Sequence, residues 1–160
     1  MSVIEAGAEV PEFALTTEDG EKFTREDLLA TGRTSVLVFY PFAFSPVCND
    51  QLTLYEDVLA DLAERGATMY AISTDARWSQ AAFKDKLGST VTQLSDFEPK
   101  GATARAFGVL HDGGFTQRAL VIVNPDGTVR WSYQAPAPGD LPGANLIFDG
   151  LDFVISSRRG

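Results

Sequence analysis

Cysteine and histidine are almost absent from this sequence of 160 residues, which contains one of each, Cys48 and His111. A single cysteine excludes an internal disulfide, a paired-cysteine redox motif and a cysteine-cluster metal site. A single histidine excludes the usual histidine-rich metal centres, and no phosphate-binding glycine loop follows a predicted strand. We therefore expect no metal and no flavin or nucleotide cofactor. Any redox chemistry must use one sulfur and take a second thiol from elsewhere.

Long apolar runs and an excess of positive charge are also missing. No run approaches the ~18 to 20 consecutive apolar residues of a membrane span. The first six residues lack a basic segment followed by an apolar one, so no secretory signal is expected and the cytoplasm is the predicted location. The 22 acidic and 13 basic residues give a formal charge of −9. Such a surface repels nucleic acids and anionic membranes, and neither is an expected partner.

The length and composition fit a single domain over residues 1–160 that buries a core without disulfides. Its most informative stretch is 34–66. An apolar strand at 35–40 leads through a turn at 41–46 into one long helix that begins near Val47 and ends at Arg65–Gly66. The helix carries an inward stripe at three- and four-residue spacing that starts at Cys48 and continues through Leu52, Tyr55, Leu59 and Leu62. Ser45 is a natural N-cap and Pro46 a natural first helical residue.

The remaining patterns predict a mixed, partly parallel sheet with helices on both faces. An N-terminal hairpin turns at Asp19–Gly20 and precedes a short helix from Thr24. A strand at 67–73 completes a β-α-β unit, and a helix at 77–87 follows. A short strand at 91–94, a helical turn at 101–107 and a hairpin of strands 119–124 and 128–133 come next. The closing helix has an apolar face, with Leu146, Ile147, Leu151, Val154 and Ile155.

This order fits an α/β, thioredoxin-like fold, although element order alone leaves a flavodoxin-like sheet open. The aromatic residues Phe83 and Trp78, on the helix at 77–87, are expected in the core.

The position of Cys48 gives the sequence its chemical interest. A lone cysteine is most often a small buried hydrophobe. At a helix N-terminus, however, the sulfur meets the positive end of the helix dipole and unpaired N–H groups, which favour the thiolate over the thiol. The position therefore predicts a reactive sulfur.

Several segments resemble the peroxiredoxin family. The segment from Pro41 through Ser45 to Cys48 has the PxxxSxxC form of that family's active-site motif, with serine in place of the commoner threonine. Similar segments are Gly7–Leu15, Leu94–Phe97, Ala106–Val109, and Arg118 ahead of the strand ending in Asn124–Gly127. The segments 39–44 and 94–97 look most like the one-cysteine, alkyl hydroperoxide reductase E-type branch.

The resemblance implies a thiol-dependent peroxidase that reduces hydrogen peroxide and organic hydroperoxides. Cys48 would be the peroxidatic thiolate and pass through a sulfenic acid. Arg118 would stabilise the thiolate and the peroxide oxygens, Ser45 would orient the peroxide, and Pro41 would shield the pocket. Gln51 would position Arg118. An external thiol or redoxin would resolve the sulfenic acid, and a homodimer through the loops around the active site is expected.

Two other functions fit the same residues. In a peroxide-sensing switch or binding module, oxidation of Cys48 would change the affinity for a partner with little turnover. In a cysteine–histidine hydrolase, Cys48 would act with His111. The second is disfavoured, because His111 lies in a glycine-rich turn next to Asp112, where a solvated histidine is the ordinary outcome.

Overall fold

The structure is a computed structural model that describes residues 2–153. Its seven strands are β1 (Ala14–Thr17), β2 (Lys22–Thr24), β3 (Thr34–Phe39), β4 (Ala67–Ser73), β5 (Thr92–Ser95), β6 (Ala119–Val123) and β7 (Val129–Gln134). Its helices are α1 (Arg25–Ala30), α2 (Pro46–Glu56), α3 (Leu59–Glu64), α4 (Arg77–Leu87), α5 (Ala102–Ala106) and α6 (Ala144–Asp152). These elements alternate along the chain much as the sequence predicts.

All seven strands form one sheet in the order β2-β1-β5-β4-β3-β6-β7. Strands β3, β4 and β5 are parallel, which confirms the predicted β-α-β unit, while β6 runs antiparallel to β3. The predicted N-terminal hairpin is also present, with Leu15 opposite Phe23. The antiparallel β6 beside the central strand excludes the all-parallel, flavodoxin-like alternative.

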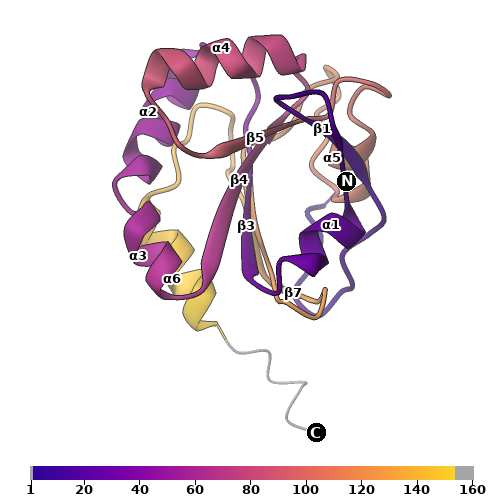
Figure 1. The fold of residues 1–160 in the computed structure, drawn as a ribbon, viewed down its shortest axis with the longest axis vertical. Coiled ribbons are helices and arrows are strands. Elements are labelled where there is room, and N and C mark those ends of the chain that lie inside the picture. The colour runs from indigo at the N-terminus through magenta and orange to yellow at the C-terminus, as the bar shows by residue number, and fades with distance from the viewer. Residues whose placement is uncertain (1, 154–160) are drawn as a thin grey trace, which may run out of the picture.

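The alternation of side chains along β3 divides the core into two layers. Val36 and Val38 face α2, α3, α4 and α6, whereas Leu37 and Phe39 face α1 and α5. Figure 1 shows these two groups of helices on opposite sides of the sheet. Every residue of β3 is buried, as expected for a central strand covered on both faces. Cys48 belongs to the layer that contains α2.

The prediction of one long helix from Val47 to Arg65 is wrong, because the structure has two shorter helices, α2 and α3, with a break at Asp57–Val58. The N–H groups of these two residues bond to carbonyls three residues back, which tightens the turn. Glu56, the last residue of α2, accepts hydrogen bonds from Ser89 and Thr90, so the end of α2 is tied to the loop before β5.

Trp78 is not a core residue, contrary to expectation, because 69% of it is exposed, whereas Phe83 is buried as predicted. Trp78 lies in the first turn of α4, and its ring packs under the Arg77 guanidinium instead of against the sheet. The predicted apolar positions 154 and 155 of the closing helix lie outside the described residues. Within residues 2–153, no helix is long and apolar enough to cross a membrane.

The packing of α6 on the sheet makes a prediction for Gly150. A Cβ atom there would lie 2.5 Å from Cε3 of Trp131 and 2.7 Å from Cδ1 of Ile122. Alanine gains up to ~1 kcal/mol in helix propensity, but overpacking costs about 1–3 kcal/mol. We expect Gly150→Ala to lower the free energy of unfolding, measured by urea denaturation. Gly139→Ala, with no atom within 4 Å of its Cβ, is the matched control. Equal stability of both variants would contradict this packing.

Candidate active site

Two segments seventy residues apart in the chain meet at one edge of the sheet. Strand β3 ends at Phe39 and leads into the turn before α2, while β6 begins at Ala119, directly opposite Phe39 in the antiparallel ladder. The residue before β6, Arg118, therefore lies beside the turn that leads to Cys48. The register between β3 and β6 therefore places the guanidinium near the sulfur, although the two residues are far apart in the sequence.

Cys48 is the third residue of α2, so it stands in the first turn as predicted. Its sulfur accepts a hydrogen bond from Nη2 of Arg118 at 3.3 Å. The residue is 0% exposed and packs in the apolar layer around Tyr40 and Leu52. The sulfur thus combines a helix N-terminus, a cation and little water.

Arg118 is only 2% exposed, and its side chain donates hydrogen bonds to two neutral oxygens and to the Cys48 sulfur among the described residues. Nε donates to the Pro138 carbonyl at 2.8 Å, and Nη1 donates to Oε1 of Gln51. No ion pair joins Arg118 to a carboxylate within the described part of the chain. A buried charge without an ionic partner is costly. A negative charge on the Cys48 sulfur would relieve that cost.

The other predicted site residues lie in α2 and in the turn that precedes it. Gln51 is buried one helical turn after Cys48 and contacts Arg118 directly, and Pro41 is buried at the start of the turn. Ser45 occupies the N-cap position of α2, and Pro46 is the first helical residue. The Ser45 side chain makes no capping hydrogen bond, so it does not serve as the cap expected of it. Ser45 is half-buried, and its hydroxyl has no hydrogen-bond partner within residues 2–153.

Asp75, just after β4, holds the turn before α2 and was missed by the sequence reasoning. Its Oδ2 accepts hydrogen bonds from the Ala43 N–H at 2.8 Å and from the Ser73 hydroxyl at 2.7 Å. The turn contains Phe44, a non-glycine residue with a positive φ of 69°, a conformation that the surroundings must enforce. The sequence did offer one signal for Asp75: it is a carboxylate at the carboxyl end of a strand parallel to β3, the end at which the turn before α2 also lies.

Tyr55 and the loop at 136–142 also belong to the surroundings of Arg118, and the sequence reasoning assigned both to structure alone. The Tyr55 hydroxyl accepts from Nε2 of Gln51 at 3.2 Å and donates to the Pro142 carbonyl at 2.7 Å. A tyrosine in an otherwise aliphatic helix stripe is the signal for such a contact, because a buried hydroxyl needs a partner.

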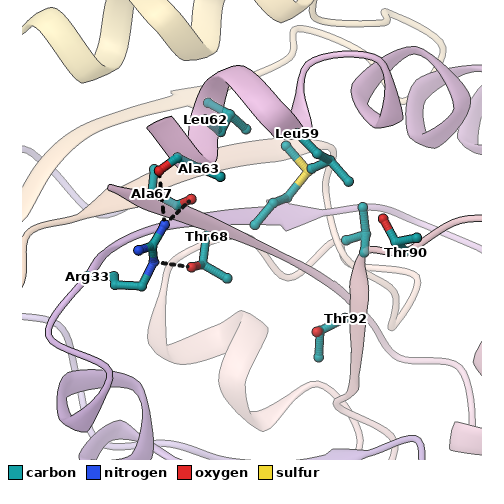
Figure 2. A pocket seen from close by; sticks show the side chains of 10 residues that line it. Arg33, Leu59, Leu62, Ala63, Ala67, Thr68, Thr90 and Thr92 are labelled. Carbon is teal, nitrogen blue, oxygen red and sulfur yellow. Dashed lines mark hydrogen bonds between the residues drawn. The ribbon is translucent and has the colours of Figure 1, made fainter. Parts of the chain in front are cut away.

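Surface clefts are also present away from Cys48. Figure 2 shows one of about 230 Å³ between α3 and the first residues of β4 and β5. Its Arg33 donates Nε to Thr68 and Nη2 to the carbonyls of Ala63 and Ala67, so it closes the end of α3. The described residues lining it include no cysteine, histidine or carboxylate. This cleft offers none of the chemistry found around Cys48.

His111 is not part of the Cys48 site. Its ring stacks on Phe115 at a centroid distance of 4.2 Å, and its Nδ1 accepts from the Gly113 N–H at 2.9 Å. No hydrogen bond joins it to Cys48 among the described residues, and the geometry gives no support to a cysteine–histidine hydrolase. Residues 2–153 also contain no group of three or more potential metal ligands.

Known proteins match both the chain and its fold. Residues 6–132 match the AhpC/TSA family. The chain belongs to this family. It is 27% identical over 150 residues to alkyl hydroperoxide reductase E of Mycobacterium tuberculosis, covering 93% of this chain and 97% of that protein. It is 32% identical over 109 residues to the putative peroxiredoxin bcp of Coxiella burnetii, and the match covers 68% of this chain and 70% of that protein. The structure of Enterococcus faecalis AhpC superposes with a TM-score of 0.83 at 28% identity, and the superposition covers 95% of this chain and 92% of that chain.

These matches confirm the predicted resemblance to peroxiredoxins, and the solved structures confirm the thioredoxin-like fold. An AhpC/TSA protein of this kind is a peroxiredoxin-type peroxidase and antioxidant oxidoreductase. Its one cysteine, Cys48, is the residue that meets the buried guanidinium.

The anchoring of the turn makes a prediction for Asp75. In Asp75→Ala, the Ala43 N–H and the Ser73 hydroxyl lose their shared acceptor, and the free energy of unfolding should fall by about 1–3 kcal/mol. Amide hydrogen exchange at residues 42–45 should become faster. Asp75→Asn keeps one acceptor oxygen and should lose less. The account of this anchor fails if exchange in the turn is unchanged in the alanine variant.

Proposed function

We propose that this protein is a thiol-dependent peroxidase that reduces hydrogen peroxide and organic hydroperoxides at Cys48. The observation that carries the proposal is the buried Arg118 guanidinium 3.3 Å from the sulfur, at the N-terminus of α2. The thiolate attacks the hydroxyl oxygen of the peroxide, an S–O bond forms and the O–O bond breaks. The leaving alkoxide or hydroxide takes a proton from water, and Cys48 becomes a sulfenic acid.

Each neighbouring residue has a role in this step. Arg118 stabilises the thiolate and then the charge that develops on the leaving oxygen, through charge-assisted hydrogen bonds. Gln51 holds Nη1 of Arg118 and so fixes the plane of the guanidinium. The uncommitted Ser45 hydroxyl orients the peroxide, and Pro41 covers the pocket without adding an N–H donor. The helix N-terminus adds its dipole at the same point.

Recovery of the thiol needs a second sulfur from outside this chain, because Cys48 is its only cysteine. An external thiol attacks the sulfenic sulfur, releases water and forms a mixed disulfide. A second external thiol then reduces that disulfide and frees Cys48. A small-molecule thiol and a redoxin both satisfy this chemistry. If Cys48 were instead a peroxide-sensing switch, oxidation would occur once and turnover with a thiol would be negligible.

The peroxidase proposal predicts the behaviour of two variants. With equimolar hydrogen peroxide at neutral pH, the wild type should form a sulfenic acid trapped by dimedone, and Cys48→Ser should form none. Arg118→Ala should slow oxidation about 100-fold, the usual effect of removing a donor that stabilises developing charge. His111→Gln is the control and should react at the wild-type rate. Intact-mass spectrometry and a peroxidase assay with excess thiol provide the measurements.

Two results would contradict the peroxidase proposal, and a third would favour the switch. An unmodified thiol in the peroxide-treated wild type would refute the proposal, as would full peroxidase activity in the Cys48→Ser variant. One oxidation event without repeated turnover, in the presence of excess small-molecule thiol and of a redoxin, would favour the switch.

The proposal also includes a homodimer that forms through the loops around the active site. Four large aromatic residues are exposed where the parallel strands end: Phe42, Phe44, Trp78 and Phe97, with exposures between 44% and 69%. Carboxyl ends of parallel strands meet at one edge of the sheet, so these residues follow the strand ends at the same edge as Cys48. Exposed apolar patches of this kind are typical of protein interfaces. The cytoplasm stays the predicted location.

Sedimentation equilibrium tests the dimer. The wild type should sediment at twice the mass of the chain, and Trp78→Asp should shift it toward the monomer because a charge is buried in the apolar interface. Leu54→Asp provides a control, since Leu54 is also exposed but lies in the last turn of α2, at the end of the helix away from Cys48. A wild type that sediments as a monomer at all concentrations would overturn this part of the proposal.

A further inference from the structure

A chain of hydrogen bonds runs from the loop at 136–142 to the Cys48 sulfur through buried side chains. The Pro142 carbonyl accepts from the Tyr55 hydroxyl, and that hydroxyl accepts from Nε2 of Gln51. Oε1 of the same amide accepts from Nη1 of Arg118, whose Nη2 donates to Cys48. Tyr55 and Gln51 are both 0% exposed, so water does not replace any of these contacts.

The direction of every bond in this chain is fixed by its ends. A backbone carbonyl only accepts hydrogen bonds, so the single Tyr55 proton goes to Pro142. The hydroxyl oxygen can then only accept from Gln51, which turns the amide NH₂ toward Tyr55 and Oε1 toward Arg118. Burial raises the pKa of Tyr55 to about 12, although Gln51 and Arg118 act against the rise, so the proton is present at neutral pH. Tyr55 therefore holds the Gln51 amide in the orientation that Arg118 requires.

The same tyrosine anchors the loop that covers Arg118. Residues 136–141 are all exposed, whereas Pro142 is buried and bound to Tyr55. Between these, the Pro138 carbonyl accepts from Nε of Arg118 at 2.8 Å. The prolines at 136, 138 and 142 restrict the loop backbone. The guanidinium is thus held on one edge by Gln51 and on another by the loop, and Tyr55 connects to both.

We propose that Tyr55, together with the loop at 136–142, is the positioning element that aims Arg118 at Cys48. This inference rests on the peroxidase function proposed above and adds the residue and the loop that set its rate. Tyr55 does not touch the sulfur or the peroxide. It acts by keeping the Gln51 amide and the Pro138 carbonyl in place, so that Nη2 of Arg118 points at the reacting atoms.

Stopped-flow oxidation by hydrogen peroxide tests this role with an isosteric variant. Tyr55→Phe removes one oxygen atom and should lower the second-order rate constant about tenfold, since small errors in the aim of a catalytic group are costly. Tyr133→Phe is the matched control. Tyr133 packs against the same apolar layer, but its hydroxyl makes no hydrogen bond to any described residue. The control should oxidise at the wild-type rate.

A double-mutant cycle separates positioning from general stability. If Tyr55 acts through Arg118, the Arg118→Ala/Tyr55→Phe variant should react no more slowly than Arg118→Ala alone. Equal losses from Tyr55→Phe in both backgrounds would overturn the inference, as would a Tyr55→Phe rate equal to wild type. All rates are taken well below the thermal unfolding midpoint of each variant, so a loss of stability alone does not lower them.

A loop variant tests the second half of the inference without changing Tyr55. Pro138→Ala keeps the carbonyl that binds Arg118 but removes the ring that restricts the backbone. It should lower the same rate constant two- to threefold, and a rate equal to wild type would exclude the loop from the positioning element. Failure of the peroxidase proposal gives a different result, because the wild type itself would then react no faster than a free thiol in solution, and the inference would fail with it.

Discussion

The central constraint in this protein is a buried guanidinium that forms no ion pair with any carboxylate of residues 2–153. Arg118 is almost fully enclosed, and among the described residues its acceptors are an amide oxygen, a backbone carbonyl and the Cys48 sulfur. Arginine does not lose its proton in proteins, so the cost of burial cannot be avoided by neutralisation. Of these acceptors, only the sulfur can carry a negative charge. The fold thus buries the positive charge of Arg118 beside a sulfur whose negative charge would offset the cost of burial.

The rest of the fold serves to keep that charge in place. The antiparallel pairing of β6 with β3 brings Arg118 beside the turn that precedes α2, and the helix start sets Cys48 at the dipole. Asp75 fixes the turn by a backbone hydrogen bond, and Tyr55 joins α2 to the loop over the guanidinium. These contacts come from the segment after β4, from α2 and from the loop at 136–142, so the site depends on the tertiary fold as well as on the PxxxSxxC motif.

Much of this arrangement could be predicted from sequence because it depends on local patterns. The apolar run of β3, the proline at the start of α2 and the hairpin around Pro125–Gly127 each specify their own element. The break between α2 and α3 could not be predicted, since the apolar stripe continues past Val58 without a glycine or proline. Asp75 and Tyr55 were missed for a related reason. Each side chain signals that it needs a partner, but the Ala43 N–H and the Pro142 carbonyl are backbone groups 32 and 87 residues away, which the sequence does not identify.

The most direct test of this account is the ultraviolet absorbance of the thiolate at neutral pH, taken as the difference between the wild type and Cys48→Ser. The account predicts a clear thiolate signal in the wild type. It also predicts that Arg118→Met, which keeps the bulk of the side chain without its charge, largely loses that signal. A wild-type sulfur that stays protonated at neutral pH, or a thiolate signal that persists undiminished without the guanidinium, would contradict it.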